Sequence, residues 1–351
     1  MKYLFISLLI LLIIACDDKS TDEPNHNIRR IYLHAYDYSQ NFFLLDTSYI
    51  KIYEECYKTS TPIIPQFAAP YRIKEIEVWE NEKNTIDQPI EAEAVAFADL
   101  PPKQISNTSL PYNERFYDPS MKYAPIQTGK IERGKFHRLD DTAYHFDYNL
   151  GILNIYNLRQ DRTYAVAYRI EGETTAMEDD LFYGTLSTVS APKDTLILKL
   201  IYIGNIIPDF TSLWQRQLKN YYQFDMSGID MDKIDIKIYY IYQYNDTLEY
   251  FEDIPDKLVT ILGVDRTNNS TWSEPPDGKF DLRLPYFDKS RGIIMFPTLQ
   301  PFNNGLRAYF TKINREDLIN KYIYPEVYDT TWFDAMQNVE KDKYLIVIES
   351  K

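Results

Sequence analysis

An internal repeat constrains the fold of this 351-residue chain more than any other feature of its sequence. The segment Phe146-Asp147-x-x-x-Gly151-Ile152-Leu153-x-Ile155-x-x-Leu158 returns as Phe287-Asp288-x-x-x-Gly292-Ile293-Ile294-x-Phe296-x-x-Leu299, at an offset of 141 (287 − 146). The pattern is typical of a strand that ends at Phe-Asp, a glycine turn, and a second strand whose branched residues enter the core. The sequence therefore predicts two related modules.

Composition favours strands over helices. The chain has 31 tyrosines and 18 phenylalanines but only 11 glycines. Aromatic and β-branched residues suit pleated, half-buried surfaces, and the shortage of glycine argues against glycine-rich phosphate loops. We therefore predict a mainly β fold, a β-rich α+β class, with two related β-sandwich-like modules and a few short helices. The modules are expected at residues 31–195 and 196–351.

Helical spacing occurs at two places in the second module. Trp214, Leu218 and Tyr222 lie at i, i+4 and i+8, which predicts a helix near residues 212–222. A helix near residues 329–339, capped by Asp329 or Thr330, is predicted from the apolar residues Trp332, Ala335, Met336 and Val339. Both apolar stripes are interpreted as core.

The first thirty residues carry signals for export. Met1-Lys2 precedes an apolar run that is shorter than the ~20 residues of a membrane-spanning helix, so residues 1–15 are interpreted as a signal peptide. Ile13-Ile14-Ala15-Cys16 resembles the lipobox of bacterial lipoproteins, in which the cysteine is acylated and begins the mature chain. Residues 16–30 are then the lipidated cysteine and a polar, flexible tether.

Charge and anchor together predict where the protein acts. The formal net charge of −14 provides no electrostatic footprint for nucleic acid, so no nucleic-acid partner is expected. Attachment to the lipid bilayer is expected through acyl chains on Cys16. We predict a lipid-anchored outer-membrane protein, either at the cell surface or on the periplasmic face.

Several stretches in order resemble a known family. They include Glu75-Ile76-Glu77-Val78-Trp79, Leu262-Gly263-Val264-Asp265-Arg266, Pro276-Asp277-Gly278-Lys279-Phe280-Asp281 and Arg291-Gly292-Ile293-Ile294-Met295-Phe296-Pro297. From about residue 70 to the end they resemble the amino-terminal region of the SprA (Sov) translocon family of type IX secretion and gliding motility. This resemblance implies a free-standing copy of the non-barrel module, with a non-catalytic role in binding or bracing an envelope secretion assembly. Outer-membrane secretion proteins are the partners it implies.

The sequence contains no recognisable catalytic motif. The four histidines have no zinc-type spacing, and no serine or cysteine lies in a nucleophile motif, so we expect no enzyme activity and no firm metal site. One loop has the oxygen ligands that calcium prefers, although not at EF-hand spacing: Asp265, Asn268, Asn269, Asp277 and Asp281. Backbone-capping turns are the alternative explanation of that loop, and no other cofactor is expected.

Aromatic residues leave a second function open. Surface lipoproteins that partner TonB-dependent transporters stack glycans on tryptophan and tyrosine. Of the four tryptophans, Trp79 and the two on predicted helices are interpreted as core, which leaves Trp272 as a candidate ligand-stacking residue. A glycan- or nutrient-binding lipoprotein with a transporter protein as partner is therefore the alternative.

Overall fold

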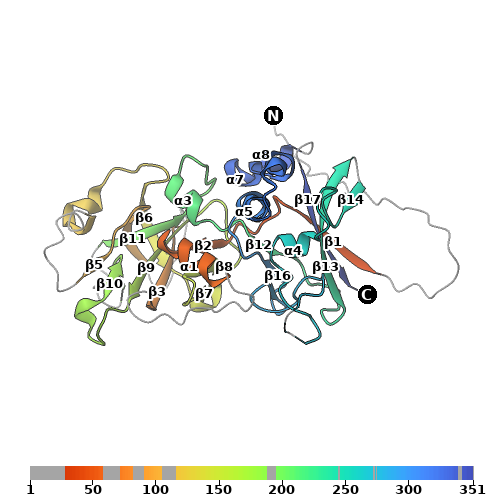
Figure 1. Cartoon of the computed structure of the whole chain (residues 1–351). Coiled ribbons are helices and arrows are strands. Elements are labelled where there is room, and N and C mark those ends of the chain that lie inside the picture. The colour runs from red at the N-terminus through yellow and green to blue at the C-terminus, as the bar shows by residue number, and fades with distance from the viewer. Residues whose placement is uncertain are drawn as a thin grey trace.

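The computed structural model describes residues 28–57, 72–81, 91–104, 116–187, 195–243, 246–271, 273, 275–338 and 342–350. The predicted signal peptide, Cys16, most of the tether and Trp272 lie outside these residues. None of the helices in the described part has the length and apolar character needed to span a bilayer. The described chain forms an elongated body with sheets at both ends and in the middle (Figure 1).

A seven-stranded sheet forms one end of the molecule. Its order is β11-β4-β6-β3-β9-β10-β5, and β9 pairs with β11 as well as β3, so five of the strands close into a small barrel. The strands are β3 (Ile73–Asn81), β4 (Glu91–Phe97), β5 (Lys103–Gln104), β6 (Ile131–Arg138), β9 (Thr163–Ile170), β10 (Leu181–Tyr183) and β11 (Leu196–Tyr202). Closure removes unpaired edges from these five strands.

A four-stranded antiparallel sheet forms the other end. Its order is β1-β17-β13-β14, from β1 (Arg29–His34), β17 (Tyr344–Ser350), β13 (Ile234–Gln243) and β14 (Asp246–Leu248). The first and last strands of the described chain are therefore neighbours. Aromatic rings join this sheet to the helices beside it, as Phe302 stacks on Tyr344 with ring centroids 4.6 Å apart.

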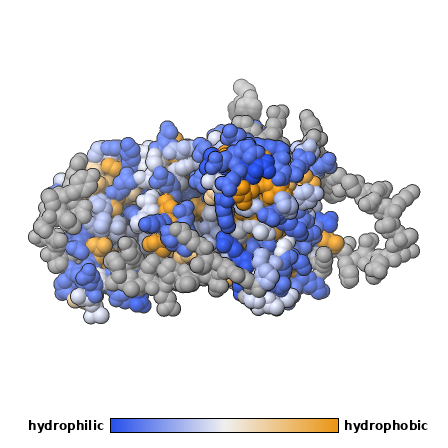
Figure 2. Space-filling view, viewed as in Figure 1, coloured by the Kyte–Doolittle hydropathy of each residue, from blue (hydrophilic) through white to orange (hydrophobic). Residues whose placement is uncertain are grey.

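The helices are short, and those from α4 onward gather beside the four-stranded sheet, whereas α3 lies beside the barrel (Figure 1). They are α1 (Ser48–Cys56), η1 (Pro119–Tyr123), η2 (Asp141–Ala143), η3 (Met177–Asp179), α3 (Thr211–Arg216), α4 (Leu258–Ile261), η4 (Pro301–Gly305), α5 (Leu306–Lys312), η5 (Glu316–Leu318), α6 (Ile319–Tyr322), α7 (Glu326–Asp329) and α8 (Trp332–Gln337). On the face shown in Figure 2, hydrophilic residues cover most of the surface, and apolar residues gather near α5.

The repeat predicted from sequence forms two matching three-stranded sheets in the centre. The first is β2-β8-β7, from β2 (Phe42–Leu44), β7 (Tyr144–Asp147) and β8 (Ile152–Ile155). The second is β12-β16-β15, from β12 (Tyr221–Gln223), β15 (Phe287–Asp288) and β16 (Ile293–Met295). Their hairpins have the same register, and both turn glycines, Gly151 and Gly292, are left-handed, with φ of 63° and 62°. The predicted turn and buried strand are confirmed.

The third strand of each sheet belongs to the same duplication. In each copy an asparagine side-chain amide donates to an equivalent carbonyl at the end of the central strand, Asn41 to Ile155 at 3.2 Å and Asn220 to Phe296 at 2.8 Å. The offset of these strands is 179 (220 − 41), not 141, because the intervening segments differ in length. Two equivalent rings, those of Phe42 and Tyr221, stack with centroids 4.7 Å apart.

Paired hydrogen bonds cross between the two copies in a symmetric way. Ser39 N donates to Tyr221 O at 2.7 Å, and Leu218 N donates to Phe42 O at 2.9 Å. Ser39 and Leu218 are equivalent at the offset of 179 (218 − 39), as are the two acceptors. Such reciprocal contacts are what a local two-fold axis produces, so the two copies pack as a pseudo-symmetric pair.

The mainly β, β-rich α+β class is confirmed. The expected division after residue 195 does not follow the sheets, because β11 pairs with β4 and β9 of the first half, and β1 pairs with β17 of the second. A single large core cluster contains residues of both halves. Ala167-Tyr168 returns in the sequence as Ala308-Tyr309, also at an offset of 141 (308 − 167). The first pair lies in β9 and the second in α5, so the structural repeat ends before them.

The predicted helix near 212–222 is wrong beyond Arg216. The chain becomes extended at Gln217, with ψ of 118°, and residues 221–223 are strand β12. Residues four apart share a face on a strand as well as on a helix, so the stripe at Trp214, Leu218 and Tyr222 did not distinguish them. The helix predicted near 329–339 is present as the shorter α8. Its predicted cap, Asp329 or Thr330, is wrong, because Thr331 caps it and its hydroxyl accepts a hydrogen bond from Asp334 N.

Candidate functional site

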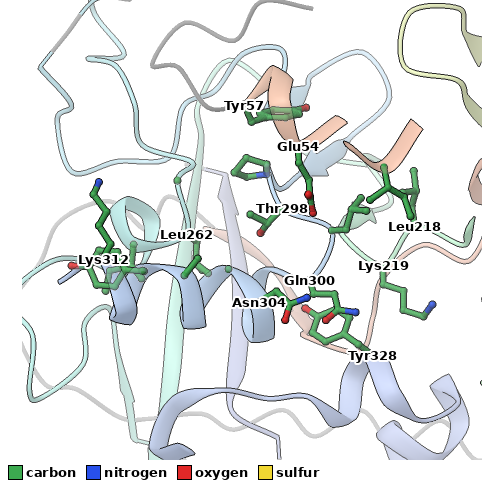
Figure 3. A pocket seen from close by; sticks show the side chains of 18 of the residues that line it. Glu54, Tyr57, Leu218, Lys219, Leu262, Thr298, Gln300, Asn304, Lys312 and Tyr328 are labelled. Carbon is green, nitrogen blue, oxygen red and sulfur yellow. The ribbon is translucent and has the colours of Figure 1, made fainter. Parts of the chain in front are cut away.

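A large groove lies beside the second three-stranded sheet. It has a volume of about 1160 Å³. Helix α1 lies on one side and α5 on the other, and the carboxylate of Glu54 points from α1 into the space between them (Figure 3). The ends of α3 and α4 and the segment after β16, residues 297–300, complete the wall.

The groove wall is mixed in chemistry. Apolar side chains come from every contributing element, among them Ile50, Leu218, Leu262, Leu299 and Ile313. Aromatic side chains also line it: Tyr57, Trp214, Tyr309 and Tyr328. Between them lie uncharged polar groups, including Gln300 and Asn304 on the α5 side (Figure 3). The wall thus offers apolar surface and hydrogen-bonding groups together.

The groove is balanced in charge, unlike the chain as a whole. Among its described lining residues are three acidic side chains, Glu54, Asp256 and Asp265, and three basic ones, Lys219, Arg266 and Lys312. The whole chain has a formal net charge of −14. This local balance means that the groove suits a ligand with both signs of charge, or with neither, better than a strongly charged one.

Lys219 is a buried cation at one end of the groove. Its ammonium lies 3.9 Å from the centroid of the Trp214 ring and donates to Trp214 O at 3.0 Å, at the carboxyl end of α3. Burial lowers its pKa to about 7. No carboxylate of the described chain forms a salt bridge with it, so carbonyl oxygens and an aromatic face hold the charge.

Trp214 packs against the core from helix α3, as interpreted, but it also lines the groove. It is half-buried on the groove wall, and its indole Nε1 donates to Tyr328 O at 2.9 Å. Trp79, by contrast, is buried in the barrel on β3, as expected for a core strand. The sequence did not predict Trp214 as a groove residue, because the wall opposite it is formed by segments that are distant in the chain.

The five residues predicted as possible calcium ligands lie close together in one loop, but their side-chain oxygens accept hydrogen bonds from groups of that loop. Asp265 accepts hydrogen bonds from the amides of Asp277 and Gly278, both at 3.2 Å, and Asp281 accepts from Arg266 N at 2.9 Å. The side chain of Asn269 accepts from Leu282 N, and that of Asn268 from Ser270 N. Asp277 accepts from Asn269 N and from Lys279 N, both at 3.1 Å. All five side chains therefore make the backbone-capping bonds that are the alternative explanation of this loop.

Burial also affects the charge in this loop. Asp265 is 3% exposed, and burial raises its pKa above the usual value for aspartate. In the part of the chain that the structure describes, no three His, Cys, Asp or Glu side chains are grouped so that they could hold a metal ion. The five loop residues therefore act as a structural network here, and calcium binding stays a prediction.

Little in the sequence pointed to the groove. Its wall combines residues from 50–57, 214–219, 256–266 and 297–313 with Tyr328, and these are far apart in the chain. One signal was available: Asn-Phe-Phe at Asn41 and Asn-Tyr-Tyr at Asn220 mark equivalent strands, and the second borders the groove.

The chain was compared with known proteins. No protein-family model matches it, and no curated protein is significantly similar to it. The resemblance to the translocon family therefore rests on the quoted motifs alone.

Proposed function

We propose that this protein is a non-catalytic, lipid-anchored outer-membrane protein that binds a polypeptide segment of an envelope secretion assembly. The observation that carries the proposal is the groove between α1 and α5, with its volume of about 1160 Å³ and its mixed wall. The proposal assigns the groove to a protein partner and not to a reaction.

The size and chemistry of the groove favour a polypeptide. Small-molecule sites usually enclose about 300–1,000 Å³ and rely on a few convergent polar groups. This groove is larger, and its polar groups are spread over several elements together with apolar and aromatic side chains. A polypeptide segment has the same mixture of backbone amides, apolar side chains and charges of both signs.

The envelope assembly is proposed from the sequence. The lipobox-like segment that ends at Cys16 supports attachment to the outer membrane, and the ordered motifs from Glu75 to Pro297 support kinship with the secretion and gliding translocon. Secretion or motility components of the outer membrane are accordingly the proposed partners.

A charged substitution in the groove tests the binding site. Ala308 is exposed on α5 and lines the groove, so Ala308→Arg places a long cation where the partner segment would lie. We expect recovery of the partner from native outer membranes, measured by pull-down and quantitative mass spectrometry, to fall by about tenfold or more. Thr311→Arg is the matched control, because Thr311 is exposed on the same helix but does not line the groove.

Two results would contradict the proposal. Equal recovery of the partner by wild type and Ala308→Arg would remove the groove from the interaction. Recovery of a TonB-dependent transporter without any secretion or motility component would replace the assembly role with nutrient capture.

The anchor has a separate test. Cys16→Ser removes the thiol that acylation requires, so we expect the protein to move from the outer-membrane fraction to the soluble fraction. Intact-mass analysis of the wild type should show a mature chain that begins at Cys16 and carries acyl chains. An unmodified wild-type cysteine would disprove the anchor without bearing on the groove.

A further inference from the structure

A second cleft lies beside the first three-stranded sheet. It has a volume of about 520 Å³. Its wall comes from the start of β2, the segment that follows β8, and the end of β12. It is distinct from the large groove, since none of the described residues lines both.

The internal duplication relates the two sites. At the offset of 179, Gln40 of the cleft corresponds to Lys219 of the groove (219 − 40). At the offset of 141 (297 − 156), Tyr156, Asn157 and Leu158 correspond to Pro297, Thr298 and Leu299, which also line the groove. In both copies, the segment after the central strand packs against the start of the neighbouring strand. This shared backbone arrangement thus makes a hollow in each copy.

The two hollows differ sharply in chemistry. Among the residues that the structure describes, seven line the cleft, and none of these is charged. Five of them are carboxamides: Gln40, Asn41, Asn157, Gln160 and Gln223. In a chain in which 26% of residues are charged, this composition separates the cleft from the surrounding surface.

Three of the five carboxamides are available to a ligand, because Asn41 Nδ2 already donates to Ile155 O and Gln223 Nε2 to Arg291 O. Within the described chain, no side-chain hydrogen bond engages Gln40, Asn157 or Gln160, and the latter two are exposed. A carboxamide both donates and accepts hydrogen bonds, which matches a hydroxyl group, since a hydroxyl also does both. Tyr156, 38% exposed, adds an aromatic ring with an apolar face and a polar tip.

We propose that this cleft is a binding subsite for a neutral saccharide segment. Carboxamides would pair with sugar hydroxyls, the ring of Tyr156 would cover an apolar sugar face, and Leu158 would form an apolar floor. The absence of charge in the lining means that neither a phosphate nor a uronate would gain an ion pair there. The proposal does not depend on what occupies the large groove.

Titration of the purified chain with neutral glucan, mannan and galactan oligosaccharides tests this proposal, with calorimetry as the readout. We expect at least one of them to bind, and Tyr156→Ala to weaken that binding by about tenfold or more. Asn157→Ala combined with Gln160→Ala should weaken it similarly. Tyr123→Ala is the matched control, because Tyr123 is 70% exposed and lies outside the cleft.

Other outcomes would overturn the proposal. Absence of binding to every neutral oligosaccharide, or binding that survives both cleft variants, would exclude the subsite. Tighter binding of a uronate oligosaccharide than of its neutral counterpart would also contradict it. Ala308→Arg, which acts on the large groove, should leave saccharide binding unchanged, so a failure of one proposal is distinguishable from a failure of the other.

Discussion

Replacement of Arg216 by methionine is expected to lower the free energy of unfolding by about 3 kcal/mol, a large loss for a single substitution. The Arg216 side chain is buried at 1% exposure. Its guanidinium donates to four backbone carbonyls, those of Ser212, Leu45, Ala98 and Leu200. These carbonyls belong to α3, the turn after β2, the turn after β4, and β11.

The expected loss of stability is large because methionine cannot replace the hydrogen bonds that the guanidinium donates. The apolar stem is kept, but four buried acceptors lose their donor, and each unsatisfied group costs about 1–3 kcal/mol before relaxation. Removal of a buried positive charge offsets part of this cost. Urea unfolding followed by circular dichroism measures the difference.

A control variant separates the effect of losing a buried arginine from that of losing any arginine. Arg307→Met changes an exposed arginine on α5 and should alter stability by less than about 0.5 kcal/mol. If Arg216→Met were as stable as this control, the guanidinium would not be what holds these four segments together.

Neutralisation of Asp46 is the second large expected effect. Its carboxylate forms a salt bridge with Lys199, which is 3% exposed on β11 of the barrel. Asp46→Asn keeps an oxygen for the amide of Ser48, which now donates to Asp46 Oδ1 at 2.9 Å, but it removes the negative charge. A buried ammonium without its counter-charge is costly, so we expect a loss of about 3 kcal/mol.

The pH dependence of this loss has a definite sign. Burial lowers the pKa of Lys199 to about 8, below the 10.5 that is usual for a lysine, although Asp46 opposes that shift. Between these values the unfolded chain binds more protons, so this lysine makes stability rise with pH from about 8 to 10.5. In Asp46→Asn the pKa of Lys199 falls further, so the rise should begin at a lower pH.

A double-mutant cycle checks the assignment. Lys199→Met in the Asp46→Asn background removes the stranded charge and should recover most of the lost stability. Failure of the double variant to recover, at neutral pH, would show that Asp46 stabilises the fold by another contact.

Features formed by neighbouring residues were predictable from the sequence, whereas features formed by distant segments were not. The hairpins at Gly151 and Gly292 were predictable because the turn and both strands lie within about ten consecutive residues. The third strand of each unit was not predicted, because Phe42 and Tyr221 pair with strands far along the chain, at an offset that differs from that of the hairpins. The helix expected near 212–222 failed for a related reason: backbone pairing of Tyr221–Gln223 with β16 outweighed an apolar spacing that suits both structures.

The candidate sites follow the same division. Asn268, Asn269 and the three aspartates of their loop were recognised as oxygen-rich, but only the fold shows that loop amides occupy these oxygens. The groove and the cleft could not be foreseen, since each wall combines segments from distant parts of the chain.

By itself, the sequence determined the β-rich class and the duplicated hairpin, because strand propensity and turn chemistry act over a few neighbouring residues. The tertiary structure alone decided three further features: the closure of the barrel through β9 and β11, the pairing of β1 with β17, and the two unlike hollows made from one repeated unit. These depend on contacts between residues distant in sequence, which local patterns do not encode.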